Sequence, residues 1–272
     1  MDYKVIDLSV HRRSAVITLR RPDRGNAWTG RLHAEYVNAM GRAEANPEVR
    51  TIVVTGQGWA FCVGGDAEAL SGHADRGSYD DGLGAADGEL TRFPGTDPRF
   101  DHQLAFHFGL TKPVIAAING PAAGIGLALA CFADLRFAVP GAKLTAAHGK
   151  LGLTPEYGLS WLLPRHIGLT RAMDLLLTSR VFLTDEAHDI GLINRLVPAD
   201  QLMTAVLDHA EEMAAWCSPG ALAATKNMVH LDQHRSVAES VADSLARLDL
   251  MMGGDEYRQG VDALNQKRSP EF

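Results

Sequence analysis

Two segments of the chain carry residue types that could stabilise a negatively charged oxygen. Residues 51–70 read TIVVTGQGWAFCVGGDAEAL, and residues 112–134 read KPVIAAINGPAAGIGLALACFAD. Each pattern predicts a buried strand, then a glycine turn, then the start of a helix. The first amides of a helix have no intrahelical partner and carry the positive end of its dipole, so they suit an anion. Two such amides converging on one oxygen would form an oxyanion hole for acyl chemistry.

Two simpler interpretations of these segments compete with that of an oxyanion hole. Residues 112–134 are apolar enough to suggest a transmembrane helix, but Asn119, Gly120 and Pro121 would break it. The glycines could also serve only to let a helix pack closely. Asp66 is best interpreted as the cap of a helix over 67–70.

Two side chains further along could move a proton. Glu156 lies in the turn at 155–158, before a helix that carries Trp161. A glutamate here usually lies on the surface and stabilises the helix dipole. Its apolar neighbours predict partial burial instead, which would raise its pKa and favour use as a base. His148 follows a short predicted strand at 142–146.

The predicted elements that position these groups are strands mixed with helices, followed by helices alone. The predicted strands are 5–10 and 15–19 as a hairpin, then 51–55, 114–118, 135–139, 142–146 and 193–197. The predicted helices are one from the Thr29 cap to Asn46, then 67–70, 101–110, 122–132, one opened at 155–158, 170–178, 184–190, 200–216, 219–229, 236–251 and 255–267. Residues 72–100 are polar and glycine-rich, which predicts a surface excursion, either a lid or a disordered loop.

Composition narrows the class of protein. The chain has 272 residues, 46% of them apolar, and a net charge of −7, which argues against a general nucleic-acid-binding surface. Its three cysteines are odd in number and far apart, so we expect a reduced, cytoplasmic protein. The first ten residues, MDYKVIDLSV, do not resemble a signal peptide. Neither a metal-ligand cluster nor a dinucleotide fingerprint is present, so we expect no metal and no redox cofactor.

Several motifs in order carry a family resemblance over nearly the whole chain. They are ITLRRPDRGNAW, the two segments above, GLTPEYG, GLINRLVP and the ending NQKRSPEF. Together they resemble the crotonase, or enoyl-CoA hydratase/isomerase, superfamily. The resemblance implies an α/β fold, with a spiral of ββα units over residues 1–199 and a helical trimerisation region over 200–272. It also implies a CoA-thioester substrate, a place in fatty acid metabolism, no bound cofactor, and homotrimers or hexamers.

The resemblance also assigns roles by position. The two oxyanion-hole amides are those of Gly65 and Ile125, although most relatives have glycine at the second position. The residues implied to contact CoA are Arg24, Ala27, Gly64, Asp66 and, across a subunit boundary, Lys267.

The departures from the family pattern decide the predicted chemistry. Hydratases of the family use two glutamates, whose positions correspond here to Ala128 and His148. Because alanine cannot exchange a proton, a hydration mechanism that needs two glutamates lacks at least one of its acid/base groups in this chain. Glu156 corresponds to the position where isomerase-type relatives place their only catalytic carboxylate. We therefore predict Δ3,Δ2-enoyl-CoA isomerase-type proton transfer with Glu156 as base and His148 as a secondary polar group. The alternatives are a hydratase, or another acyl-CoA lyase or hydrolase, using His148, and a non-catalytic CoA-thioester-binding protein.

Overall fold

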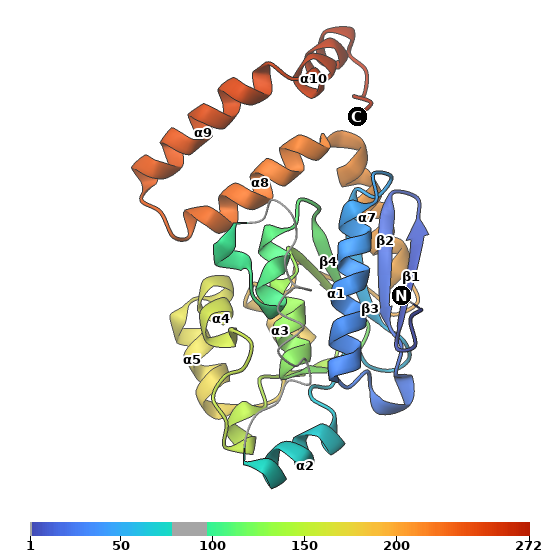
Figure 1. The fold of residues 1–272 in the computed structure, drawn as a ribbon, viewed down its shortest axis with the longest axis vertical. Coiled ribbons are helices and arrows are strands. Elements are labelled where there is room, and N and C mark those ends of the chain that lie inside the picture. The colour runs from blue at the N-terminus through green and yellow to red at the C-terminus, as the bar shows by residue number, and fades with distance from the viewer. Residues whose placement is uncertain (1, 78–96) are drawn as a thin grey trace.

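A central, mostly parallel sheet organises the computed structural model, which describes residues 2–77 and 97–272 (Figure 1). In this described part, six strands pair in the order β1-β2-β3-β4-β6-β9. Their bounds are β1 Ile6–His11, β2 Ser14–Leu19, β3 Thr51–Gly56, β4 Val114–Ile118, β6 Leu135–Ala138 and β9 Arg195–Leu196. β1 and β2 form the predicted antiparallel hairpin, and every later pairing is parallel. β3 and β4 are buried along their whole length, as their continuous apolar runs predict.

Helices cover both faces of this sheet. α1 (Gly30–Ala45) begins at Thr29, whose side chain accepts a hydrogen bond from the Leu32 amide, and it ends at Asn46 as predicted. On the opposite face α7 (Leu202–Trp216) packs Leu202, Val206 and Ala210 against the apolar side chains of the strands. The mixed α/β class predicted from the sequence is therefore confirmed. The division into 1–199 and 200–272 stays a prediction, and α7, which follows that boundary, packs on the sheet.

A second, smaller sheet corrects one predicted helix. β5 (Ala122–Ala123), β7 (Lys143–Thr145) and β8 (Phe182–Leu183) pair in the order β5-β7-β8. The predicted helix over 122–132 was wrong at its start, because α3 spans only Ile125–Phe132. The first two alanines pair with β7 instead, and Gly124 separates the strand from the helix with a φ of +51°. Only glycine adopts this conformation readily.

The remaining helices follow the sequence predictions only in part. The predicted α-helix over 101–110 is a 3-10 helix, η4 (Gln103–Gly109), preceded by η3 (Pro98–Phe100). The others are η1 Pro22–Arg24, α2 Ala67–Arg76, η5 His148–Leu151, α4 Leu159–Ile167, α5 Leu169–Thr178 and α6 Thr184–Asp189. Of these, η1 and η5 were not predicted, and α2 continues past the predicted end at residue 70 into the predicted excursion. The predicted excursion at 72–100 falls largely outside the described residues. None of the helices in 2–77 and 97–272 has the length and hydropathy needed to span a bilayer.

The last three helices leave the core. α8 (Pro219–Asp232) lies across the end of the sheet, and Figure 1 shows α9 (Val237–Met252) and α10 (Asp255–Gln266) beyond it. α9 buries none of its residues in this single chain. Large apolar side chains stand exposed on it, among them Val237, Leu245 and Leu250. This apolar face is a surface that another chain could cover.

Two buried histidines make the fold sensitive to acid. His107 lies in the core, where its Nδ1 is 2.5 Å from the Leu104 carbonyl oxygen and its Nε2 is 2.6 Å from the Tyr36 hydroxyl. Since a carbonyl only accepts, Nδ1 carries the proton and Nε2 accepts from Tyr36. Burial lowers the pKa of His107 to about 3. Burial, together with the nearby charge of Arg136, lowers the pKa of His166 to about 4.

We expect stability to fall between pH 6.5 and 4 for this reason. The unfolded chain protonates both histidines near their ordinary pKa of about 6.5, while the folded chain keeps them neutral. The unfolded chain then binds more protons than the folded chain. Each histidine therefore lowers the free energy of unfolding by up to about 1.4 kcal/mol for each unit by which the pH falls. Urea titrations at pH 7, 6 and 5 measure this slope. His166→Gln should make the slope shallower, and equal stability at pH 7 and 5 would contradict the expectation.

Candidate active site

The two glycine-containing segments lie side by side in the structure. The Ala123 amide donates to the Cys62 carbonyl over 3.0 Å, and the Cys62 amide donates to the Pro121 carbonyl over 3.2 Å. A Cβ added to Gly126 would collide with the Cys62 carbonyl oxygen, so only glycine permits this approach. A Cβ added to Gly124 would lie 4.0 Å from the Gly64 Cα. Ile125, which follows Gly124, is the first residue of α3, and Gly65, which follows Gly64, lies just ahead of the Asp66 cap of α2.

The direction of the Gly65 amide follows from its neighbours. The Trp28 amide donates to the Gly64 carbonyl over 2.8 Å, and the Asp66 amide donates to the Trp28 carbonyl over 3.0 Å. Successive groups of an extended segment alternate in direction. The N–H of Gly65 thus points away from Trp28, and Gly65 lines a cavity of about 310 Å³.

Ile125 presents its amide without backbone strain. It is the first residue of α3, so its N–H has no acceptor within the helix. The left-handed φ falls on Gly124, and the Gly124 carbonyl accepts from the Ala128 amide over 3.0 Å. Ile125 is therefore an ordinary helical residue at this position. Ile125 lines the same cavity as Gly65.

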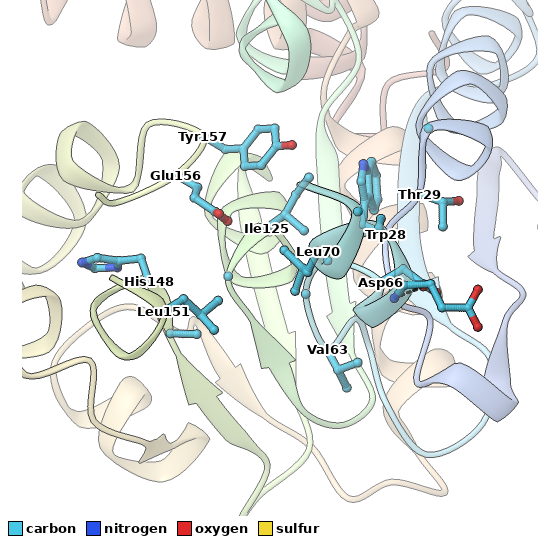
Figure 2. Close-up of a pocket in the computed structure, with 18 of the residues that line it drawn as sticks. Trp28, Thr29, Val63, Asp66, Leu70, Ile125, His148, Leu151, Glu156 and Tyr157 are labelled. Carbon is cyan, nitrogen blue, oxygen red and sulfur yellow. Dashed lines mark hydrogen bonds between the residues drawn. The ribbon is translucent and has the colours of Figure 1, made fainter. Parts of the chain in front are cut away.

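Glu156 directs its carboxylate into this cavity (Figure 2). Its Oε2 is 3.6 Å from the place that a Cβ on Gly124 would occupy, next to the start of α3. The residue is half-buried, as predicted from its apolar neighbours. Tyr157 and Gly158 have positive φ values of 48° and 77°, and this left-handed turn holds Glu156 ahead of α4. The structure thus brings the Glu156 carboxylate and two candidate amide donors to one cavity, whose lining also includes Asp66 and Glu68.

His148 is placed differently. It opens η5 and lines the cavity, but its ring points away from Glu156 and Ile125 (Figure 2). The residue is 6% exposed, and its Nδ1 has no hydrogen-bond partner among the residues that the structure describes. Ala128, at the position of the other hydratase acid, is fully buried within α3. In this arrangement the two hydratase positions do not present two acid/base groups to the cavity.

The residues predicted to contact CoA are dispersed. Gly64 and Asp66 line the cavity, and Arg24 contacts the cavity residue Glu68 through a 3.4 Å ion pair. Ala27 is buried and its carbonyl accepts a hydrogen bond from Arg21. Lys267 follows α10, at the opposite end of the molecule from α2 (Figure 1). Within one chain, Lys267 therefore does not reach this cavity.

Asp66 acts as the helix cap that its position predicts. Its carboxylate accepts from the Glu68 amide over 3.1 Å and pairs with Arg21 at 2.8 Å. Burial opposes its ionisation, but the hydrogen bonds from Arg21 and the Glu68 amide outweigh this and lower its pKa. An anchored, ionised Asp66 fixes the start of α2 beside Gly65.

Several lining residues escaped the sequence analysis. They are mostly apolar or aromatic: Trp28, Val63, Leu70, Leu151 and Tyr157. The sequence did carry a signal for most of them, because Val63 and Leu70 lie in the segment 51–70, and Leu151 and Tyr157 lie near Glu156. Among residues 2–77 and 97–272 no group of three or more metal-ligating side chains occurs.

Comparison with known proteins establishes the family. A sequence profile described as enoyl-CoA hydratase/isomerase matches residues 11–272, so the chain belongs to this family, within the crotonase superfamily, and is an enzyme.

Individual relatives cover nearly the whole chain. A probable enoyl-CoA hydratase, EchA12, of Mycobacterium tuberculosis is 36% identical over 95% of this chain and 88% of its own length. The 1,2-epoxyphenylacetyl-CoA isomerase of Escherichia coli is 31% identical over 94% of this chain and 93% of its own length. The crystal structure of a probable enoyl-CoA hydratase/isomerase from Mycobacterium abscessus superposes with a TM-score of 0.84 at 31% identity, covering 98% of both chains. The crotonase-type fold predicted from the motifs is confirmed.

Proposed function

We propose that this enzyme acts on enoyl-CoA thioesters by Δ3,Δ2-isomerase-type proton transfer, with Glu156 as the base. The observation that carries the proposal is the Glu156 carboxylate, which points into the cavity beside the start of α3. The amides of Gly65 and Ile125 would hold the thioester oxygen. A substrate carbonyl placed there has its α carbon within reach of Glu156.

The proposed reaction balances with one base. Glu156 removes a proton from the α carbon, and the electron pair of that C–H bond moves onto the thioester oxygen as an enolate. The two amide donors stabilise this charge where it develops. As the enolate collapses, the double bond shifts to the α,β position and Glu156 returns the proton at the γ carbon. The mass of the substrate does not change.

Hydration remains the second candidate. Relatives such as EchA12 are named probable enoyl-CoA hydratases, and His148 has a buried nitrogen without a partner in the described structure. Against hydration, Ala128 cannot exchange a proton and the His148 ring points away from Glu156. Another relative, from Escherichia coli, is named 1,2-epoxyphenylacetyl-CoA isomerase, so the names of the relatives include an isomerase as well as hydratases. Binding without turnover is the least supported alternative, because the relatives compared with this chain carry the names of enzymes.

The remaining parts of the proposal concern CoA and the assembly. We propose that Arg24, Ala27, Gly64 and Asp66 contact the CoA arm, and that Lys267 of a neighbouring subunit reaches its phosphates. The exposed apolar residues of α9 would lie between subunits of a homotrimer or hexamer. Sedimentation at the mass of a single 29.3 kDa chain would contradict this assembly. A cytoplasmic location is proposed from the cysteines alone, which are free in the structure.

Product masses decide between isomerisation and hydration. Purified protein is mixed with a 3-enoyl-CoA in one tube and a 2-enoyl-CoA in another. We expect the 3-enoyl substrate to become the conjugated isomer at unchanged mass. A 2-enoyl substrate that gains the mass of one water, with the 3-enoyl substrate left unchanged, would overturn the isomerase proposal. Turnover of neither substrate, despite binding, would favour the third alternative.

A further inference from the structure

Glu156 lies between two cavities. Beside the cavity described above is a second, larger one of about 540 Å³. The two share Glu156 and Tyr157. The other residues that line the second cavity are His102, Gln103, Leu104, Ala105, Phe132, Leu153, Thr154 and Gly158.

The inner part of the second cavity is apolar and aromatic. Leu104 and Phe132 are buried, and Ala105 and Tyr157 are partly buried beside them. Polar groups lie toward solvent, where His102 and Thr154 are exposed. Such a gradient suits an apolar group that enters from the side of Glu156.

The walls of this cavity are held in place. Phe132 packs against Phe108 with ring centroids 5.2 Å apart, and against His107 at 5.8 Å. His107 in turn bonds Tyr36 and the Leu104 carbonyl, which fixes η4. A Cβ on Gly158 would lie 3.8 Å from Phe132, and its φ of +77° favours glycine. A rigid, preformed wall can select among acyl groups because it does not collapse around a small one.

The aromatic side chains of Phe106 and Trp161 lie outside the wall of this cavity. Phe106 is 1% exposed and stacks on His107 with centroids 4.5 Å apart, and Trp161 packs against Phe108 and His234. Neither is among the described residues that line either cavity. The tighter 3-10 winding of η4 turns Leu104 and Ala105 toward the second cavity instead.

We infer that the second cavity binds the acyl part of the thioester beyond its β carbon and selects groups that carry a ring or a branch, with Tyr157 and Ala105 as the specificity-determining residues. This inference rests on the proposed function for the thioester end at Gly65 and Ile125 and for the CoA arm near Arg24. If the CoA arm leaves the first cavity on the side of Arg24, the acyl part extends to the other side of Glu156. A short straight chain would leave much of the rigid apolar wall uncovered, whereas a ring covers Phe132 and Tyr157.

Binding of saturated thioesters tests the inference without any turnover. Calorimetry would compare cyclohexylacetyl-CoA with butyryl-CoA, neither of which has a double bond to move. We expect wild type to bind cyclohexylacetyl-CoA at least about tenfold more tightly than butyryl-CoA. In a pocket that fits its ligand, a small difference in the size of an apolar group changes the affinity about 10-fold or more. Ala105→Phe should remove this preference by filling the cavity, and the matched control Ala105→Ser should keep it. Equal affinity for the two ligands in wild type would overturn the inference.

A second variant tests the inference if Ala105→Phe does not fold. Tyr157→Ala removes the ring shared by the two cavities, so it should weaken the binding of cyclohexylacetyl-CoA more than that of butyryl-CoA. Tyr157→Phe keeps the ring and should retain the preference for the cyclohexyl ligand. An equal loss for both ligands in Tyr157→Ala would assign the residue a structural role and contradict the inference. A ring preference in wild type without isomerase activity would refute only the proposed function. Isomerase activity without a ring preference would refute only the selectivity inferred here.

Discussion

Replacing Glu156 by glutamine is expected to lower isomerase turnover by about 10²–10⁴-fold, the usual contribution of a positioned acid/base group. Glutamine fills the same volume beside Gly124 but cannot accept the α proton. Because the shape of the site is kept, KM should change little while kcat falls. Steady-state rates of 3-enoyl-CoA isomerisation, followed by absorbance of the conjugated product, measure both constants.

His148→Ala provides the comparison for this variant. Its ring points away from the carboxylate, so we expect a much smaller loss of turnover than in Glu156→Gln. Binding of butyryl-CoA by both variants shows whether the cavity is still formed. Full turnover in Glu156→Gln would refute the assignment of the base. Loss of activity in His148→Ala, with Glu156→Gln active, would identify His148 as the acid/base group of the second candidate function.

The largest expected effect on stability comes from a buried ion pair that joins α8 to the core. Lys226 Nζ lies 2.6 Å from Asp134 Oδ2 and 3.1 Å from the Lys112 carbonyl. Asp134 also accepts from the Val114 amide over 2.7 Å, and its Oδ1 is 3.3 Å from His230. Burial would oppose ionisation of Asp134, but Lys226 and the hydrogen bonds lower its pKa to about 2.

We expect Lys226→Met to lower the free energy of unfolding by about 3–5 kcal/mol, because it leaves a buried carboxylate without its cation. Urea unfolding at pH 7 and one protein concentration measures the change, since assembly would also affect apparent stability. In wild type the contribution of Asp134 is present above its unfolded pKa of about 3.9 and is lost as pH falls toward its folded pKa of about 2. This window lies below the one set by the buried histidines.

Arg12→Met is the matched control for Lys226→Met. Arg12 pairs with Asp208 at 2.8 Å, but both side chains are more than half exposed, at 56% and 57%. Water screens such a pair, so we expect a loss of at most about 1 kcal/mol. The double variant Lys226→Met/Asp134→Asn, which removes both charges, should recover part of the loss. Equal stabilities of Lys226→Met and Arg12→Met would show that the buried pair does not anchor α8.

Local patterns predicted most of the secondary structure. The hairpin, the buried strands β3 and β4 and the Thr29 cap of α1 follow from apolar runs, turn residues and a capping side chain within a few positions of each other. The secondary-structure prediction was wrong where pairing with a distant segment outweighed the local preference of the chain. Ala122 and Ala123 have high helix propensity, yet they pair with β7 because strand pairing there outweighs propensity.

The sequence by itself determined the family, the mixed α/β class and the presence of one carboxylate, Glu156, at a position suited to proton transfer. The tertiary structure decided which groups meet. The pairing of Cys62 with Ala122, which lie 60 positions apart in the sequence, brings Gly65 and Ile125 to one cavity. Only packing turns the His148 ring away from Glu156 and places Ala105 and Tyr157 on the wall of the same cavity. Side-chain direction depends on contacts between segments far apart in sequence, and no local pattern encodes those contacts.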